Sequence, residues 1–205
     1  MPPTIAIIAA GEMGSALAHR LSKSGCAIVT NLDGRSEATK RRAREAGMQN
    51  VPFADLPIYA NFVLSILPPG EAVDLAQRFL SAWEAADSNK VVRDVIYADC
   101  NAVSPETVKA IAAPYAERNI RFIDAGIIGL PPREDYDPTI YVAADLKDDS
   151  ALHAFEALGR YGLKVTTLRG DSVGVGDASA LKMSYAVPSF FVFTIDHRTN
   201  SYFLV

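Results

Sequence analysis

The segment from Thr4 to Leu17 constrains the fold more than any other part of the chain. Its sequence, TIAIIAAGEMGSAL, begins as a continuous apolar run, passes through a glycine turn and continues with apolar residues at helical spacing. A buried strand, a tight turn and a helix in this order predict a dinucleotide-phosphate site. The glycines let the backbone approach a pyrophosphate, and the first N–H groups of the helix bind its negative charge.

The glycine spacing in this turn is incomplete. The usual pattern is G-x-G-x-x-G, but Ala9 holds the first position, whereas Gly11 and Gly14 hold the other two and enclose Glu12 and Met13. The context supports the dinucleotide interpretation, since the pattern follows an apolar strand and opens a helix. The alternative is an ordinary strand–turn–helix unit with no ligand.

The bulk properties are those of a soluble globular protein. The chain has 205 residues, of which 49% are hydrophobic and 21% charged. A net charge of -4 argues against nucleic acid as the main partner, and no apolar run reaches the roughly 18 residues that span a membrane. The two cysteines, Cys26 and Cys100, have no Cys-x-x-Cys partner and are expected to be buried thiols in a reducing cytoplasm.

Strand and helix signals alternate along most of the chain. This alternation predicts an α/β fold with a Rossmann-like, doubly wound and mostly parallel sheet. We expect strands over 4–9, 26–32, 62–67, 92–99, 120–125, 139–144 and 163–168, with a short strand at 50–52 as an option. We expect helices over 12–24, 36–47, 71–84, 105–118 and 149–161. The expected organisation is a dinucleotide-binding domain over 1–170 and a second unit over 171–205.

The second unit breaks the regular alternation. A helix is predicted to begin at Asp177 and to end near Ala186, and Val187–Ile195 is aromatic and strand-like, with a proline that disfavours a helix. We interpret this unit as the remnant of a truncated helical domain with an irregular tail. The apolar window Phe190–Phe193 is expected to lower solubility, because such windows pair edge to edge when they are exposed.

The end of the second predicted strand bears on the choice between NADP and NAD. A carboxylate at this distance from the glycine turn commonly binds the ribose 2′-OH of NAD, and Asp33 occupies that position. Arg35 and Ser36 follow at a helix start and are suited to the 2′-phosphate of NADP. The pattern favours NADP, with NAD as the alternative. The basic run Lys40–Arg42 is interpreted as a solvated helix face.

Further candidate site residues lie at the ends of three later predicted strands, where ligands bind in open α/β sheets. Leu67 and Pro68 are candidates for a wall of the cofactor site, and Asn101 is a candidate for hydrogen bonding to nicotinamide or substrate. Asp124 and Gly126 are candidates for substrate binding. A structural anchor is the alternative for Asp124, and close approach of another chain segment is the alternative for the glycine.

Lys182 is the candidate catalytic residue. It lies two turns into the last predicted helix, where an ammonium could donate a proton to a carbonyl or imine as a hydride arrives. By spacing alone an exposed helical lysine is the stronger interpretation. The three histidines, His19, His153 and His197, do not form a metal-binding pattern, and we expect no metal.

Four blocks of the sequence resemble the β-hydroxyacid dehydrogenase superfamily, which includes 6-phosphogluconate and 3-hydroxyisobutyrate dehydrogenases. The resemblance is greatest to the branch described as phosphogluconate dehydrogenase, NAD-binding. The blocks are Ile8–Gly14, Gly34–Ser36, Asp124–Gly126 and Gly176–Met183, in family order. The resemblance implies that Lys182 is the proton donor or acceptor.

The same resemblance implies a Rossmann-like domain extended by an antiparallel strand pair, here at about 139–168, and a C-terminal helical domain that completes the substrate cleft and usually the dimer. Two positions depart from the family pattern. Ile128 stands where the family has a substrate-binding serine, and Ala186 replaces an asparagine that follows the lysine. The resemblance therefore supports cofactor binding better than a sugar-phosphate substrate.

Together these features indicate an NADP-binding protein that transfers a hydride between NADP(H) and a small hydroxyacid or a related carbonyl or imine. Its expected partners are the dinucleotide and a small molecule, with a homodimer as a candidate assembly. A non-catalytic dinucleotide-binding module and a reductase of the pyrroline-carboxylate type are the alternatives. Because few residues follow Lys182, we expect this lysine to be left in water and turnover to be poor.

Overall fold

The computed structural model describes residues 1–86, 91–92, 94–186, 193–196 and 201–204. The strands of the main sheet are β1 (Thr4–Ile8), β2 (Ala27–Thr30), β3 (Met48–Asn50), β4 (Phe62–Ser65), β5 (Ile96–Asp99), β6 (Arg121–Ile128), β7 (Thr139–Ala143) and β8 (Lys164–Thr167). The α-helices are α1 (Glu12–Lys23), α2 (Glu37–Glu45), α3 (Leu56–Tyr59), α4 (Ala72–Ala85), α5 (Pro105–Glu117), α6 (Asp149–Glu156) and α7 (Asp177–Ala186).

The eight strands form one sheet in the order β3-β2-β1-β4-β5-β6-β7-β8. All neighbouring pairs are parallel except β6 and β7, which are antiparallel. This arrangement confirms the predicted mostly parallel sheet with an extension. The two strands of the extension, β7 and β8, run antiparallel to the other six strands, which confirms the antiparallel extension, and they run parallel to each other. The connection through α6 allows this parallel pairing.

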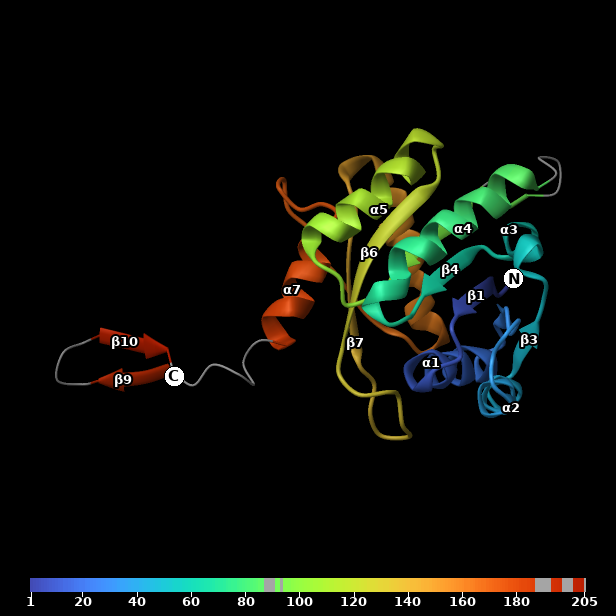
Figure 1. Cartoon of the computed structure of the whole chain (residues 1–205), viewed down its shortest axis with the longest axis horizontal. Coiled ribbons are helices and arrows are strands. Elements are labelled where there is room, and N and C mark those ends of the chain that lie inside the picture. The colour runs from blue at the N-terminus through green and yellow to red at the C-terminus, as the bar shows by residue number, and fades with distance from the viewer. Residues whose placement is uncertain (87–90, 93, 187–192, 197–200, 205) are drawn as a thin grey trace.

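Alternate residues of the strands face two separate cores. Ile5 and Ile7 of β1 belong to the core covered by α1, α2 and α6. Ala6 and Ile8 belong to the core covered by α3, α4 and α5, and α4 and α5 lie over the same face of the sheet (Figure 1). A strand that is buried on both faces has a continuous apolar sequence, as β1 does. The doubly wound architecture is therefore confirmed.

The later part of the chain departs from the prediction at several points. Strand β6 continues to Ile128, beyond the predicted end at 125, because β7 pairs with its second half. Helix α7 packs against β6 and α5. Strands β9 (Phe193–Asp196) and β10 (Ser201–Leu204) pair with each other in a separate antiparallel sheet, and β10 was not predicted. Most of the predicted strand over 187–195 lies outside the described residues.

The described helices are short or amphipathic, and none of them could cross a lipid bilayer.

Candidate functional site

The glycine turn connects β1 to α1 at the carboxyl edge of the sheet. Gly11 is the N-cap of α1, and a Cβ atom added to it would have no atom within 4 Å. A Cβ added to Gly14 would lie 2.1 Å from the carbonyl oxygen of Ala9. Gly14 therefore permits the close packing of α1 on the strand end, whereas Gly11 leaves open space above the helix N-terminus. This is the shape that a pyrophosphate needs.

The two residues between these glycines, Glu12 and Met13, differ in their exposure to solvent. Glu12 is exposed in the first turn of α1, and Met13 packs partly buried against the core. Neither side chain covers the backbone of the turn in the way that a capping side chain would. The backbone N–H groups at the helix start are thus the groups that Gly11 leaves accessible to an anion.

A cavity of about 350 Å³ lies beside the carboxyl ends of β1 and β2. Arg35 and Arg78 both line it, and the Arg35 guanidinium lies 3.9 Å from the Glu71 carboxylate. The Arg78 guanidinium lies over the Phe53 ring at 4.3 Å from its centroid. The lining residues come from the ends of β1 and β2, from the segments after β3 and β4, and from α4. They are Ile8, Asn31, Asp33, Gly34, Arg35, Phe53, Leu67, Glu71, Asp74, Leu75 and Arg78.

Sequence reasoning missed Arg78 and Phe53 as members of this cavity. Arg78 lies on the exposed side of α4, and Phe53 lies in a short 3-10 segment after β3. Neither residue belongs to a recognisable motif. Both were missed because only the fold brings α4 beside the end of β2. The pair places a second cation and an aromatic face next to Arg35, which suits a phosphate and an adenine ring.

Asp33 and Ser36, the other candidates at the end of β2, have their own local partners. The Asn31 side-chain amide donates to the Asp33 carboxylate at 2.9 Å. The Ser36 hydroxyl accepts the backbone N–H of Thr39 at 3.3 Å and caps α2. Asp33 lines the cavity and Ser36 does not.

The basic run after Ser36 divides into two kinds of contact. Lys40 and Arg41 face solvent and pair within α2, as predicted, with Glu37 and Glu45 respectively. Arg42 differs, since its guanidinium Nε donates to the carbonyl oxygen of Ala10 at 3.0 Å. The interpretation of a solvated face is therefore wrong for Arg42, which ties α2 to the glycine turn.

Asn101 connects the loop after β4 to the loop after β5. Its side-chain oxygen accepts the backbone N–H of Leu67 at 2.6 Å, and its amide nitrogen donates to the Ser65 hydroxyl at 2.8 Å. Leu67 lines the cavity at the end of β2, and Pro68 beside it is exposed. Asn101 is buried, with 2% of its surface exposed, and holds these loops together. Its predicted contact with nicotinamide or substrate stays a prediction.

Lys182 lies at the carboxyl edge of the sheet, beside the end of β5 and away from the cavity at the end of β2. Its ammonium donates to the carbonyl oxygen of Cys100 at 3.1 Å, and the side chain is partly buried. Burial lowers the pKa of Lys182, while Cys100 and the carboxylates of Asp99 and Asp124 act in the opposite direction. The expectation that this lysine is left in water is therefore wrong, because α7 packs on β6 and brings the side chain to the end of β5.

Asp124 and Gly126 position α7. The Asp124 carboxylate is fully buried and accepts the backbone N–H groups of Gly176 and Ser179 at 2.9 and 3.0 Å, as well as the Ser179 hydroxyl at 2.6 Å. A Cβ added to Gly126 would lie 2.7 Å from the carbonyl oxygen of Ala178. Asp124 is thus a structural anchor and Gly126 a point of close approach. The substrate contacts predicted for them stay predictions.

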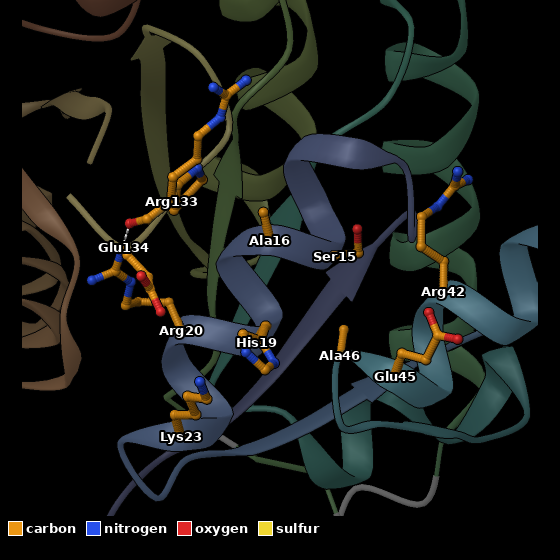
Figure 2. A pocket seen from close by; sticks show the side chains of 11 residues that line it. Ser15, Ala16, His19, Arg20, Lys23, Arg42, Glu45, Ala46, Arg133 and Glu134 are labelled. Carbon is orange, nitrogen blue, oxygen red and sulfur yellow. Dashed lines mark hydrogen bonds between the residues drawn. The ribbon is translucent and has the colours of Figure 1, made fainter. Parts of the chain in front are cut away.

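A larger cavity of about 590 Å³ lies apart from these residues, between α1, the end of α2 and the loop before β7 (Figure 2). Arg20 of α1 donates to the carbonyl oxygen of Arg133 and pairs with Asp137 at 2.9 Å. Lys23 and Glu134 are also part of the lining. None of the residues predicted for the functional site lines this cavity.

Comparison with known proteins gives a family match over most of the chain. Residues 4–169 match the model of the NAD-binding domain of 6-phosphogluconate dehydrogenase. Mitochondrial 3-hydroxyisobutyrate dehydrogenase of Drosophila melanogaster is 25% identical over 158 residues, which are 76% of this chain and 47% of that protein.

Solved structures agree with this match. A conserved protein of unknown function, described as similar to 3-hydroxyacid dehydrogenases, aligns with a TM-score of 0.72 and 33% identity, over 89% of this chain and 63% of that one. An imine reductase from Myxococcus stipitatus in complex with NADP⁺ aligns with a TM-score of 0.69 and 19% identity, over 90% and 60%. The second similarity concerns the fold alone. The chain thus spans less than two thirds of these relatives.

Proposed function

Since the chain belongs to the family of the NAD-binding domain of 6-phosphogluconate dehydrogenase, we propose that it binds NADP(H) and supports hydride transfer to or from a small hydroxyacid or a related carbonyl or imine. The observation that carries the NADP preference is the pair of guanidinium groups, Arg35 and Arg78, that line one cavity at the end of β2. A 2′-phosphate needs such cations, whereas a ribose 2′-OH does not.

The chain's own residues divide the binding work. The turn at Gly11 and Gly14 presents backbone N–H groups to the pyrophosphate. Phe53, under the Arg78 guanidinium, offers a flat apolar face to the adenine ring. Asp33 is the residue that supports the alternative, NAD, because its carboxylate lines the same cavity.

The proposed chemistry is centred on Lys182. When bound, the nicotinamide ring would supply or accept the hydride. Lys182 would hold or release the matching proton at its Nζ atom, which the Cys100 carbonyl oxygen positions at the end of β5. Burial lowers the pKa of this lysine, and a lowered pKa favours proton exchange near neutral pH. The reducing cytoplasm is a compatible location, since Cys26 and Cys100 are free buried thiols.

A non-catalytic dinucleotide-binding module is the second candidate. Two residues that were candidates for substrate contacts, Asn101 and Asp124, use their side chains within the chain. By contrast, the region beside the carboxyl ends of β1 and β2, where we propose that the nucleotide binds, has an open cavity. The chain spans 63% and 60% of two structural relatives, the second of which is an imine reductase in complex with NADP⁺.

Calorimetric titration with NADPH and NADH tests the cofactor proposal. We expect the wild type to bind NADPH more tightly, and Arg35→Ala and Arg78→Ala each to lose roughly 10-fold or more in NADPH affinity, because charge-assisted hydrogen bonds contribute about 1.5–3 kcal/mol. NADH affinity should change little. Lys40→Ala is the matched control, since Lys40 pairs with Glu37 and does not line the cavity. Equal affinities of the wild type for both cofactors would refute the preference.

A turnover assay separates the two candidate functions. Oxidation of small hydroxyacids and reduction of cyclic imines are followed through NADPH absorbance. Turnover that Lys182→Ala abolishes supports the enzyme. Tight NADPH binding with background turnover across both substrate classes supports the binding module.

A further inference from the structure

Three polar side chains cross the middle of the sheet in one row. Ser65 of β4 is in register with Asp99 of β5, and Asp99 is in register with Asp124 of β6. All three side chains are buried, with 0%, 1% and 0% of their surfaces exposed. Because side chains alternate along a strand, this row faces the same side as Gly126, against which α7 packs.

The two carboxylates in this row differ in their hydrogen bonds. Asp124 accepts three hydrogen bonds, one from Gly176 directly before α7 and two from Ser179 in its first turn. Asp99 accepts the backbone N–H of Asn101 at 2.9 Å through Oδ1. Its Oδ2 atom is buried and finds no hydrogen-bond partner among the described residues. A buried carboxylate oxygen without a partner destabilises a fold, so its presence needs a reason.

Lys182 provides the positive charge that acts on this carboxylate. Its ammonium is bonded to the carbonyl oxygen of Cys100, the residue that directly follows Asp99. Attraction to this ammonium favours the ionised form of Asp99, and Asp99 in turn favours the ionised form of Lys182. The other titratable groups coupled to Asp99 from the elements around it are Tyr97, Cys100, Tyr115 and Asp124.

Resting on the role proposed for Lys182, we propose that Asp99 is a positioning residue, the buried counter-charge that keeps the proton on the Lys182 ammonium. Asp124 acts on the lysine in the same direction, but less strongly than Asp99. Burial is the main cause that raises the pKa of Asp99, to about 6, so above this pH its carboxylate is ionised and opposes the loss of a proton from the lysine.

Competitive acetylation tests the proposal without any need for turnover. The protein is labelled with acetic anhydride across pH 6–11, and the modification of Lys182 is measured by peptide mass spectrometry against exposed Lys23. In Asp99→Asn the midpoint for Lys182 should fall by about one pH unit, as expected when an opposite charge nearby is removed. Asp171→Asn, which removes an exposed carboxylate, should leave it unchanged. An unchanged or higher midpoint in Asp99→Asn overturns the proposal.

The reciprocal variant keeps the test independent of how well Asp99→Asn folds. In Lys182→Met the pKa of Asp99, followed by carbon NMR of labelled aspartate carboxyl groups, should rise because the stabilising cation is gone. An unchanged Asp99 pKa overturns the proposal. Absence of turnover in the wild type would instead reject the enzyme function, and it would leave both of these measurements interpretable.

Discussion

At the scale of single residues, Gly11 and Gly14 carry different constraints although only two residues separate them. The space around Gly11 is open, whereas a Cβ at Gly14 would lie 2.1 Å from a backbone oxygen. The first glycine therefore leaves space for the proposed ligand, and the second permits the close packing of α1. This division agrees with the general roles of the second and third glycines in the G-x-G-x-x-G pattern, ligand approach and helix packing respectively.

The two alanine variants should separate these roles. Gly14→Ala should lower the free energy of unfolding by about 1–3 kcal/mol, because α1 must move away from Ala9 to relieve the overlap. Gly11→Ala should change stability by no more than about 0.5 kcal/mol, yet weaken NADPH binding, since its methyl group enters the space above the helix N-terminus. Urea denaturation and calorimetry measure the two effects. Equal destabilisation by both variants would contradict this division.

Asp99 should make stability depend on pH. Burial raises its pKa to about 6, so the folded protein holds this proton more tightly than the unfolded chain does. The resulting stabilisation is complete below the ordinary aspartate pKa near 4 and is lost as the pH rises through about 6. Between pH 4 and pH 7 the wild type should lose up to about 3 kcal/mol relative to Asp99→Asn.

Urea denaturation of both proteins at several pH values measures this difference. Asp171→Asn controls for the change in net charge. If the stability difference between wild type and Asp99→Asn is the same at pH 4 and pH 7, the buried carboxyl group does not titrate in this range.

At the scale of elements, the sequence predicted those parts of the fold whose signals are local. The predicted helix starts at residues 12, 36 and 105 agree within one residue with the starts of α1, α2 and α5, and the side chains of Ser36 and Ser104 cap the last two. Strand β6 was predicted too short, because its second half is stabilised by pairing with β7. Gly126 of β6, for example, pairs with Tyr141 of β7, which is distant in the sequence. Long-range pairing leaves no mark in a local window.

The candidate site followed the same rule. Arg35 was a candidate from its motif and lines the cavity, whereas Arg78, which also lines it, was missed because α4 reaches the end of β2 only in the fold. A structural anchor was among the interpretations of Asp124, but the partners of Asp124 and Asn101 could not be predicted, since they come from remote segments, such as Gly176 and Ser65. Sequence patterns identified polar residues at strand ends without showing which of them face inward.

The close packing of helix α7 on the sheet should depend on Gly126 in β6, the strand beneath it. In Gly126→Ala the new Cβ would lie 2.7 Å from the Ala178 carbonyl oxygen and 3.2 Å from the Lys182 Cβ, so α7 must shift outward. We expect a loss of about 1–3 kcal/mol in stability and a higher midpoint pH for the acetylation of Lys182, because the burial that lowers its pKa is relieved. Gly159→Ala, with no atom within 4 Å of the new Cβ, is the control. Wild-type Lys182 reactivity in Gly126→Ala would show that α7 is not seated as described.

At the scale of the whole molecule, the two ends of the carboxyl edge are built from different parts of the chain. The cavity beside Arg35 is lined by residues between 8 and 78, whereas Lys182 comes from α7. Leu67 and Asn101 join the two ends through one hydrogen bond. Cofactor binding and proton transfer should therefore be separable by mutation.

Lys182→Ala should bind NADPH within about two-fold of the wild-type affinity, because the lysine does not line the cavity. Calorimetry under identical salt and pH measures this, with Arg35→Ala as the variant that should fail. A ten-fold loss of affinity in Lys182→Ala would mean that the lysine contributes directly to holding the dinucleotide.

The hydrogen bonds to Asp124 also determine which part of α7 unfolds only together with the sheet. The amides of Gly176 and Ser179 donate to a carboxylate in the middle of the sheet, so they can exchange with deuterium only when the sheet itself comes apart. The amide of Tyr185, in the exposed last turn, has no such restraint. Native-state hydrogen exchange should find the start of α7 as slow as β6 and its end orders of magnitude faster. One helix would then belong to two cooperative units, with the boundary between them near Lys182.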